Sequence, residues 1–337
     1  MYEAFFNLQK SPFGMNPDPS CLFMTRSHRE ALAGLLYAIS RRKGFVVLTG
    51  DAGTGKTSLL PALIRSAESS RFSVILTPRV NSNEFLELAL LDFGLPVIPE
   101  TKSQRIVKLQ ELLMDLRLRG IAPVLMVDEA HTLSAETLEE IRLLTNFETN
   151  EEKLLQVVLA GQNDLAATLN RNDLRQLKQR IEVRMDLKPL ELADVGAYIQ
   201  YRWTHAGGSI PSPFANEAIV LIAKASGGIP RLVNSICDNC LLLAYASEKP
   251  LIGVGYVQQV LRDFDLGNST PARRNGSRLT FNELNGAPTR EFHPAIRSSI
   301  APRDFLIEDD GPSAGPTSAM SWAERMNFGA AQKRDRS

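Results

Sequence analysis

Between residues 45 and 187, short apolar runs alternate with longer stretches in which apolar residues recur every three or four positions. The short runs predict five strands, at Phe45–Thr49, Ser73–Thr77, Pro123–Val127, Leu155–Ala160 and Ile181–Leu187. Between the second and third runs, a helical period continues until Gly120 and is marked by Ile106, Leu109, Leu113 and Leu116. Strands that alternate with helices are typical of a parallel sheet with crossover helices.

After Pro189 the strand pattern ends and a helical pattern takes over. We expect four helices, at Leu192–Ala206, Pro213–Ala225, Pro230–Ser247 and Val254–Phe264, with breaks at Gly207-Gly208, Gly227-Gly228 and Pro250. From Gly267 to Ser337 the chain is rich in Gly, Pro and Ser and has no sustained apolar period, which predicts a disordered tail. The expected organisation is therefore an α/β domain over residues 1–188, including an N-terminal segment over 1–30, a small helical domain over 189–266 and a tail over 267–337.

Composition narrows the range of partners. The chain has 337 residues, of which 44% are hydrophobic, and its 38 Lys and Arg balance its 38 Asp and Glu. A formal net charge of zero gives no global field for nucleic acid or an anionic membrane. The first residues lack a secretory signal, no window reaches the ~18–20 apolar residues of a spanning helix, and three cysteines are too few for a disulfide framework. We expect a soluble cytoplasmic protein without direct membrane insertion.

A phosphate-binding loop directly follows the first predicted strand. The pattern G-x-x-x-x-G-K-[ST] is formed by Gly50, Asp51, Ala52, Gly53, Thr54, Gly55, Lys56 and Thr57. Such a loop turns its backbone N–H groups inward, and the helix after it presents its positive end to phosphates. We expect Lys56 to reach the β- and γ-phosphates of ATP, Thr57 to ligate Mg²⁺ and Ser58 to complete the nucleotide contacts. Pro61 should kink this helix or shift its early turns.

Two acids follow the third predicted strand. Asp128 is placed to hold Mg²⁺ through water, and Glu129 to orient and polarise the attacking water. Paired acids after a strand are common, but here they follow a phosphate loop in an α/β pattern, which makes the prediction specific. For His131, two readings stay open: a sensor of the nucleotide state, or a helix-flanking histidine satisfied by its neighbours.

Three further residues are candidates for the γ-phosphate end of the site. Gln162 follows the fourth strand and could position the attacking water, although a polar strand end is an equally good reading. Arg180 lies on a short basic helix, which is usually a solvated helix end that suits the helix dipole. The functional alternative, for which Arg180 is our candidate ahead of Arg175, is an arginine finger that completes a neighbouring subunit's site. Arg231 opens a helix of the second domain and could swing onto the nucleotide.

Two other features have simpler readings. Cys237 and Cys240 have a metal-like spacing, but no second pair accompanies them, and they lie in a predicted apolar helix. We therefore expect buried core thiols rather than a zinc site. The basic run Arg41–Lys43 could touch DNA phosphates, but a helix C-terminus that complements the helix dipole is the simpler reading.

Taken in this order, these motifs resemble those of the AAA+ ATPases, and among them the family of general secretory pathway protein A, the ExeA type. The likeness covers about the first 265 residues. Its motifs are Phe5-Phe6-x-Leu8, Pro12-Phe13, Pro17-Asp18-Pro19 with Phe23, His28-Arg29-Glu30-Ala31-Leu32, the phosphate loop, Asp128-Glu129-Ala130-His131, Gly161-Gln162, Leu174–Ile181 and Gly228-x-Pro230-Arg231. Transposition-associated ATPases of the TniB and TnsC type share much of this pattern.

The resemblance implies an ATP-hydrolysing, Mg²⁺-dependent P-loop NTPase with an α/β domain and an all-α lid. Residues 50–57 would bind nucleotide, Thr57 and Asp128 would hold Mg²⁺, and Glu129 would act in catalysis. Gln162 and Arg231 would sense the nucleotide, and Arg180 would act in trans. The segment Pro12–Phe23 would pack near the adenine.

The chain departs from the family pattern after Gly267, where we find neither the transmembrane helix nor the peptidoglycan-binding part of ExeA-type proteins. The expected protein is a homo-oligomeric motor or switch that serves a secretion or envelope complex through a protein partner, which could hold it at the inner membrane. The alternative is a DNA-binding ATP switch of the transposition type. A non-hydrolysing adaptor is disfavoured by intact Lys56, Asp128 and Glu129, and a helicase by the lack of a second RecA-like domain.

Overall fold

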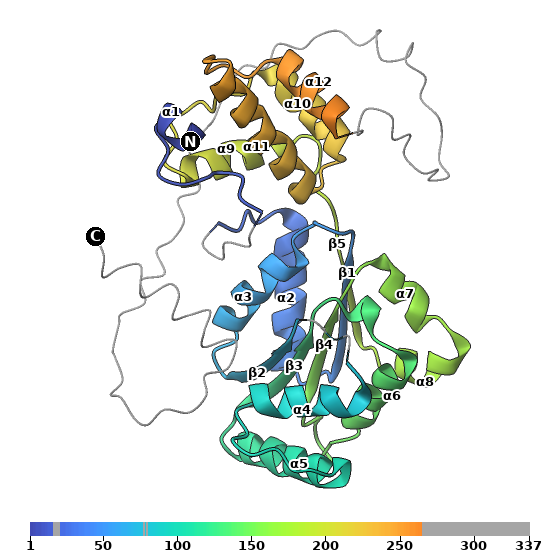
Figure 1. Ribbon diagram of the computed structural model, residues 1–337. Coiled ribbons are helices and arrows are strands. Elements are labelled where there is room, and N and C mark those ends of the chain that lie inside the picture. Colours follow the sequence, from blue (N-terminus) through green and yellow to red (C-terminus); the bar gives the residue numbers. More distant parts are fainter. Residues whose placement is uncertain (16–20, 77, 79, 265–337) are drawn as a thin grey trace, which may run out of the picture. The chain divides into compact units, whose positions relative to one another are not determined.

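The computed structural model describes residues 1–15, 21–76, 78 and 80–264, all within one compact unit (Figure 1). The strands are β1 (Phe45–Gly50), β2 (Ser70–Ile75), β3 (Ala122–Val127), β4 (Gln156–Ala160) and β5 (Val183–Leu187). The helices and 3₁₀ turns up to β5 are α1 (Tyr2–Phe5), α2 (Arg26–Ser40), α3 (Lys56–Ser66), α4 (Ser82–Asp92), α5 (Lys102–Leu118), η1 (Ala130–Thr132), α6 (Ala135–Leu144), α7 (Asn163–Leu169), η2 (Asn172–Leu174) and α8 (Arg175–Gln179). After β5 come α9 (Val195–His205), α10 (Asn216–Ser226), α11 (Pro230–Ala246) and α12 (Val254–Asp263).

The five strands form one parallel sheet in the order β2-β3-β4-β1-β5. The chain begins one strand in from an edge with β1, crosses to the opposite edge with β2, returns through β3 and β4, and ends at the edge beside β1 with β5. In open parallel sheets, ligands bind at the carboxyl ends of the strands where the strand order reverses. Here that position is the end of β1, next to the end of β4.

Successive side chains of a strand point to opposite faces of the sheet, so the apolar core has one part on each face. Val46 and Leu48 of β1 pack with α2 and α3 on one face. Phe45 and Val47 pack on the other face, in a core that includes residues of α4 to α8. Both faces are covered, as Figure 1 shows, and the strands are accordingly apolar along most of their length. This confirms the predicted parallel sheet flanked by helices.

The four helices after β5 have a separate apolar core. This core contains Trp203, Phe214, Cys237 and Cys240. The N-terminal residues Tyr2 and Phe13 are also part of it. Phe13 is 1% exposed and meets Phe214 edge to face at 5.9 Å. The backbone N–H of Gln9 donates to the carbonyl of Ala206. The first 13 residues, which sequence analysis grouped with the α/β domain, thus pack with the helices that follow β5.

The predicted elements are found with small shifts. The second strand runs three residues earlier than expected, at Ser70–Ile75, and the fifth begins two residues later, at Val183. Helix α3 runs from Lys56 to Ser66 with Pro61 inside it. Among the described residues, no helix is long and apolar enough to cross a bilayer. The predicted tail over 267–337 and the motif Pro17-Asp18-Pro19 lie outside the described residues.

Candidate functional site

The loop after β1 folds into a cradle that only glycines allow at two positions. Gly53 and Gly55 have φ values of +83° and +102°, in the left-handed region that side chains disfavour. A Cβ on Gly53 would lie 2.7 Å from Cβ of Arg231, and one on Gly55 would lie 2.9 Å from Nε2 of His28. The loop is therefore closely packed against Arg231 and His28, and its residues Ala52 to Ser58 line a pocket.

Lys56, the first residue of α3, is hydrogen-bonded to the start of the phosphate loop. Its ammonium group donates to the carbonyl oxygens of Gly50 at 2.8 Å and Asp51 at 3.0 Å. The side chain is buried, and burial lowers the pKa of Lys56, an effect that the nearby carboxylates of Glu129, Asp128 and Asp51 oppose. An ammonium held only by carbonyl dipoles in a buried loop is well suited to pair with phosphate oxygens.

Thr57 and Asp128 come together from opposite sides of β4. The Thr57 hydroxyl donates to Oδ2 of Asp128 at 2.6 Å, and the backbone N–H of Glu129 donates to Oδ1 of Asp128 at 2.9 Å. Asp128 is 2% exposed, and burial raises its pKa although both hydrogen bonds oppose the shift. A hydroxyl and a carboxylate side by side are hard oxygen ligands of the kind Mg²⁺ prefers, so these two residues fit a magnesium site.

Glu129 and Gln162 lie at the ends of β3 and β4, and both line the pocket. Glu129 adopts a left-handed backbone with φ of +50°. Its carboxylate is 3.5 Å from Nδ1 of His131, and the backbone N–H of Gln162 donates to the same nitrogen at 3.4 Å. His131 therefore lies between the two residues, so the structure brings together three polar positions that sequence analysis treated separately.

Asp51 has a partner that sequence analysis did not predict. The Asn163 amide donates to Oδ1 of Asp51 at 2.6 Å, so the start of α7 is tied to the start of the phosphate loop. Gln162 lies directly before Asn163 in the chain. The ends of β1 and β4 are thus linked through side chains as well as through the sheet.

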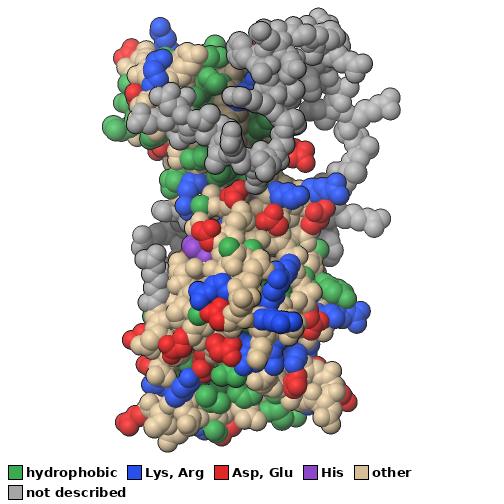
Figure 2. Space-filling model, turned by 90° about the vertical axis from the view of Figure 1, so that its right-hand side faces the viewer, with side chains coloured by type: hydrophobic (Ala, Val, Ile, Leu, Met, Phe, Trp, Pro, Cys, Tyr) green, Lys and Arg blue, Asp and Glu red, His purple; other side chains and the backbone are tan. Residues whose placement is uncertain are grey.

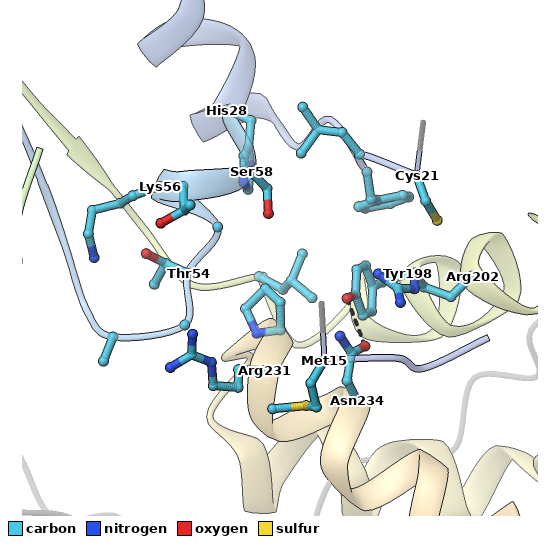
Figure 3. Close-up of a pocket in the computed structure, with 18 of the residues that line it drawn as sticks. Met15, Cys21, His28, Thr54, Lys56, Ser58, Tyr198, Arg202, Arg231 and Asn234 are labelled. Atoms are coloured by element: carbon cyan, nitrogen blue, oxygen red, sulfur yellow. Dashed lines mark hydrogen bonds between the residues drawn. The ribbon is translucent and has the colours of Figure 1, made fainter. Parts of the chain in front are cut away.

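Arg231 approaches the loop from the helices after β5. Its backbone N–H donates to the carbonyl of Gly53 at 3.3 Å, and its side chain lines the pocket, as Figure 3 shows. The positive charge of Arg231 is among the influences that lower the pKa of Lys56. Two positive groups thus face the place where phosphates would lie.

The far end of the pocket is less polar, and sequence analysis, which expected Pro12–Phe23 near the adenine, did not predict Tyr198 or Asn234 there. Tyr198 of α9 donates its hydroxyl proton to Oδ1 of Asn234 at 2.8 Å, and Cys21, Leu22 and Phe23 line the same end (Figure 3). Burial raises the pKa of Tyr198 to about 12. Aromatic and aliphatic walls with a few polar groups suit a nucleobase.

Arg202 fixes the N-terminal segment at this end of the pocket. Its guanidinium donates to the carbonyls of Pro12 at 2.7 Å and Gly14 at 3.2 Å. Of the segment Pro12–Phe23, which is expected near the adenine, Gly14, Met15 and Cys21 to Phe23 line the pocket. Residues 16–20 lie outside the described part of the chain.

Arg180 and Arg175 are not among the residues that line the pocket. Arg180 donates to Oγ1 of Thr145 at 2.9 Å and is half-buried, whereas Arg175 is exposed at the start of α8. Figure 2, viewed from the side of α7 and α8, shows basic and acidic side chains interspersed on this face. Neither arginine can act on the pocket of its own chain in this conformation, which leaves action on another chain's pocket open to test.

The pair Cys237 and Cys240 lies in the interior of α11. Both thiols are free and 0% exposed, and burial raises the pKa of Cys240 to about 12 and that of Cys237 in the same direction. Protonated thiols in an apolar core are poor metal ligands. The expectation of buried core thiols is confirmed.

Comparison with known sequences matches the chain to one family model and to several relatives. A family model for the AAA domain matches residues 39–169. General secretion pathway protein A of Aeromonas hydrophila is 41% identical over 251 residues, which cover 73% of this chain and 45% of that protein. The chain therefore spans about half the length of that relative. ATP-dependent target DNA activator B of Escherichia phage Mu is 26% identical over 255 residues, which cover 74% of this chain and 75% of that protein.

Solved structures agree on the fold. Cdc6p from Pyrobaculum aerophilum has a TM-score of 0.60 at 20% identity, with coverage of 82% of this chain and 74% of that one. The ORC2 protein of Aeropyrum pernix, solved as ADPNP-ADP complexes, has a TM-score of 0.57 at 15% identity, with coverage of 83% and 75%. At these identities the likeness concerns the fold alone.

Proposed function

The chain belongs to the AAA+ ATPases and is of the general secretion pathway protein A type, and from this premise we propose that it binds ATP with Mg²⁺ and hydrolyses it. One observation carries the proposal: Lys56, the Thr57–Asp128 pair, Glu129 and Gln162 meet at the carboxyl ends of β1, β3 and β4. A phosphate cradle, an oxygen ligand pair and a carboxylate that faces the same pocket are the parts that phosphoryl transfer to water needs.

Binding would use the loop from Gly50 to Ser58. The ammonium of Lys56 exchanges its two carbonyl partners for phosphate oxygens, which bind it more strongly because they are charged. Arg231 adds a second positive group from α11. The nucleobase lies toward Tyr198 and Asn234, at the less polar end of the pocket.

Hydrolysis would use Glu129 as the residue that orients water. Its carboxylate accepts a hydrogen bond from a water molecule in line with the γ-phosphate, and the Gln162 side chain holds that water from the other side. The water oxygen bonds to the γ-phosphorus as the bond to the β,γ-bridging oxygen breaks, ADP leaves with that electron pair, and the water proton passes through Glu129 to phosphate or solvent. Mg²⁺ held by Thr57 and Asp128 would neutralise charge on the phosphates.

Arg180 would complete the site of a second chain. The assignment is supported by its place outside its own pocket, beside the exposed helix α8. An arginine supplied in trans stabilises transition-state charge and makes turnover depend on assembly. We propose a homo-oligomer for this reason, with residues 189–266 acting as a lid whose movement accompanies turnover.

The similarity to general secretion pathway protein A supports a role in a secretion or envelope complex. In this role the protein would act in the cytoplasm, where ATP is available, and contact the membrane machine through a protein partner. A second candidate, an ATP switch that binds DNA, is supported by the similarity to ATP-dependent target DNA activator B of phage Mu. The zero net charge of the chain favours the first candidate over the second.

The two candidates separate in a turnover assay run over a series of protein concentrations, with and without double-stranded DNA. Turnover per chain that rises with protein concentration and ignores DNA supports the assembling ATPase with a protein partner. Strong stimulation by DNA supports the switch. Absence of turnover under all conditions, with ATP binding intact, would refute hydrolysis by the chain alone.

A further inference from the structure

His28 lies in the first turn of α2, far in sequence from the phosphate loop, yet it lines the same pocket. Its side chain is 4% exposed. Thr25, the N-cap of α2, is its neighbour on one side: Oγ1 of Thr25 is 2.6 Å from Nδ1 of His28 and accepts the backbone N–H of His28 at 3.2 Å. Because Oγ1 already accepts this N–H, its own proton is free to bond to Nδ1.

The other ring nitrogen faces the phosphate loop. Burial lowers the pKa of His28, and a hydrogen bond to the backbone of Thr54 opposes this shift. A bond that favours the protonated ring is one that the ring donates, so the Thr54 partner is its carbonyl oxygen. With Thr25 donating to Nδ1, the neutral ring carries its proton on Nε2, the nitrogen that points to the loop.

Nε2 of His28 also lies close to Gly55, the residue after Thr54. A Cβ on Gly55 would lie 2.9 Å from Nε2 of His28, so the ring rests directly on the loop backbone. The carbonyl of Thr54 and the N–H of Gly55 belong to one planar trans peptide and point in opposite directions. When His28 holds the carbonyl, the N–H of Gly55 is turned to the inside of the loop.

We propose that His28 is a positioning residue for the phosphate loop: its Nε2–H fixes the peptide between Thr54 and Gly55 so that the N–H faces a bound phosphate and the carbonyl faces away from it. The inference rests on the proposed nucleotide site and adds a residue to it. Without this bond the peptide can turn its carbonyl toward the phosphates, which repel it.

The hydrogen bonds of Thr25 and His28 also connect the base end of the pocket to the phosphate loop. Cys21 to Phe23 line the base end of the pocket, Thr25 follows two residues later, and His28 reaches the loop. The base end of the pocket and the phosphate loop are thus joined through Thr25 and His28.

Two substitutions distinguish the role of Nε2 from that of Nδ1. In His28→Gln the amide nitrogen can occupy the place of Nε2 and donate to Thr54, whereas in His28→Asn the shorter side chain can replace only Nδ1. The affinity of each full-length variant for ADP with Mg²⁺ is measured by calorimetry, with thermal unfolding of the nucleotide-free protein alongside. We expect His28→Asn to raise the Kd about tenfold, the effect of one lost hydrogen bond to a buried group, and His28→Gln to stay within about threefold of the wild type.

A role in packing alone would give a different result. In that case both variants lower the unfolding temperature and neither changes the Kd selectively, which would overturn the proposal. If His28→Asn does not fold, Thr25→Val takes its place: it removes the proton donor to Nδ1, and we expect a Kd increase that Thr25→Ser does not produce. Equal Kd values for Thr25→Val and Thr25→Ser would also overturn it. If the wild type itself fails to bind ADP, the proposed function fails, and this outcome is distinct from a failure of His28.

Discussion

Replacing Asp128 by asparagine should stabilise the nucleotide-free protein while it weakens metal-dependent binding. Each carboxylate oxygen of Asp128 accepts one hydrogen bond: Oδ2 from the Thr57 hydroxyl and Oδ1 from the backbone N–H of Glu129. Asparagine keeps both contacts, because its oxygen can accept from Glu129 and its amide can donate to the Thr57 hydroxyl, which also accepts. What the substitution removes is a buried negative charge.

The sign of the effect follows from the direction of the pKa shift. Burial raises the pKa of Asp128 above its ordinary value of 3.8, so the folded chain holds this proton more tightly than the unfolded chain. Stability from this group is therefore greatest at low pH and is lost as pH rises from 3.8 through the raised pKa. If the folded chain holds the proton tenfold more tightly, the cost at neutral pH is about 1.4 kcal/mol, which corresponds to a Tm change of about 3–6 °C.

Thermal unfolding in the presence of a chelator, from pH 4.5 to 7.5, measures how the stability contributed by Asp128 depends on pH. Asp128→Asn should have the higher Tm at pH 7, and its advantage should shrink toward pH 4.5, whereas the exposed control Asp263→Asn should follow the wild type. With ADP and Mg²⁺ at about 100 times the Kd, the wild type should gain about 2.7 kcal/mol and the variant clearly less. A variant that is less stable than the wild type at pH 7, or that gains equally from Mg²⁺ and ADP, would refute the reasoning.

Three other predictions address separate parts of the site. Gly53→Ala should weaken ADP binding at least about tenfold, because its Cβ would lie 2.7 Å from Cβ of Arg231 and φ is +83°; calorimetry checks this, and an unchanged Kd would contradict it. Arg180→Ala should abolish the rise of turnover with protein concentration while ATP binding is kept, and Arg175→Ala should not; the reverse result would make Arg175 the finger. Phe13→Ala should lower the unfolding free energy by about 3–5 kcal/mol in denaturant titrations, since the ring is 1% exposed in the core of α9 to α12; a loss below about 1 kcal/mol would show that the N-terminal segment does not pack there.

The sheet and its order of elements were predictable because parallel strands buried on both faces are apolar along their length. The start of β2 was not, because Ser70 and Arg71 carry no strand signal and are held by pairing with Ala122 and Pro123 on β3. Pairing partners distant in sequence leave no local mark.

The loop and the acids after β3 were predictable because the phosphate loop has a fixed spacing and the acids follow a buried strand. The contributions of His28, Tyr198 and Asn234 were not, because each lies in a helix whose local pattern is that of an ordinary core helix. Thr25 with His28 three residues later does carry a signal, an N-cap at the expected spacing, but it indicates only where α2 begins. That the ring of His28 points at Gly55 follows from the packing of α2 and α3 on the same face of the sheet.

The most direct test of the account compares the wild type with Glu129→Gln in a single-turnover ATP hydrolysis assay, with ATP affinity measured on the same preparations. Glutamine fills the same space and keeps a hydrogen-bond acceptor, but it cannot take the proton of the attacking water. The account predicts equal ATP binding and a loss of hydrolysis of about 100-fold or more, the usual contribution of a general base. Hydrolysis by Glu129→Gln at the wild-type rate would contradict the assignment of this pocket as the site of ATP cleavage.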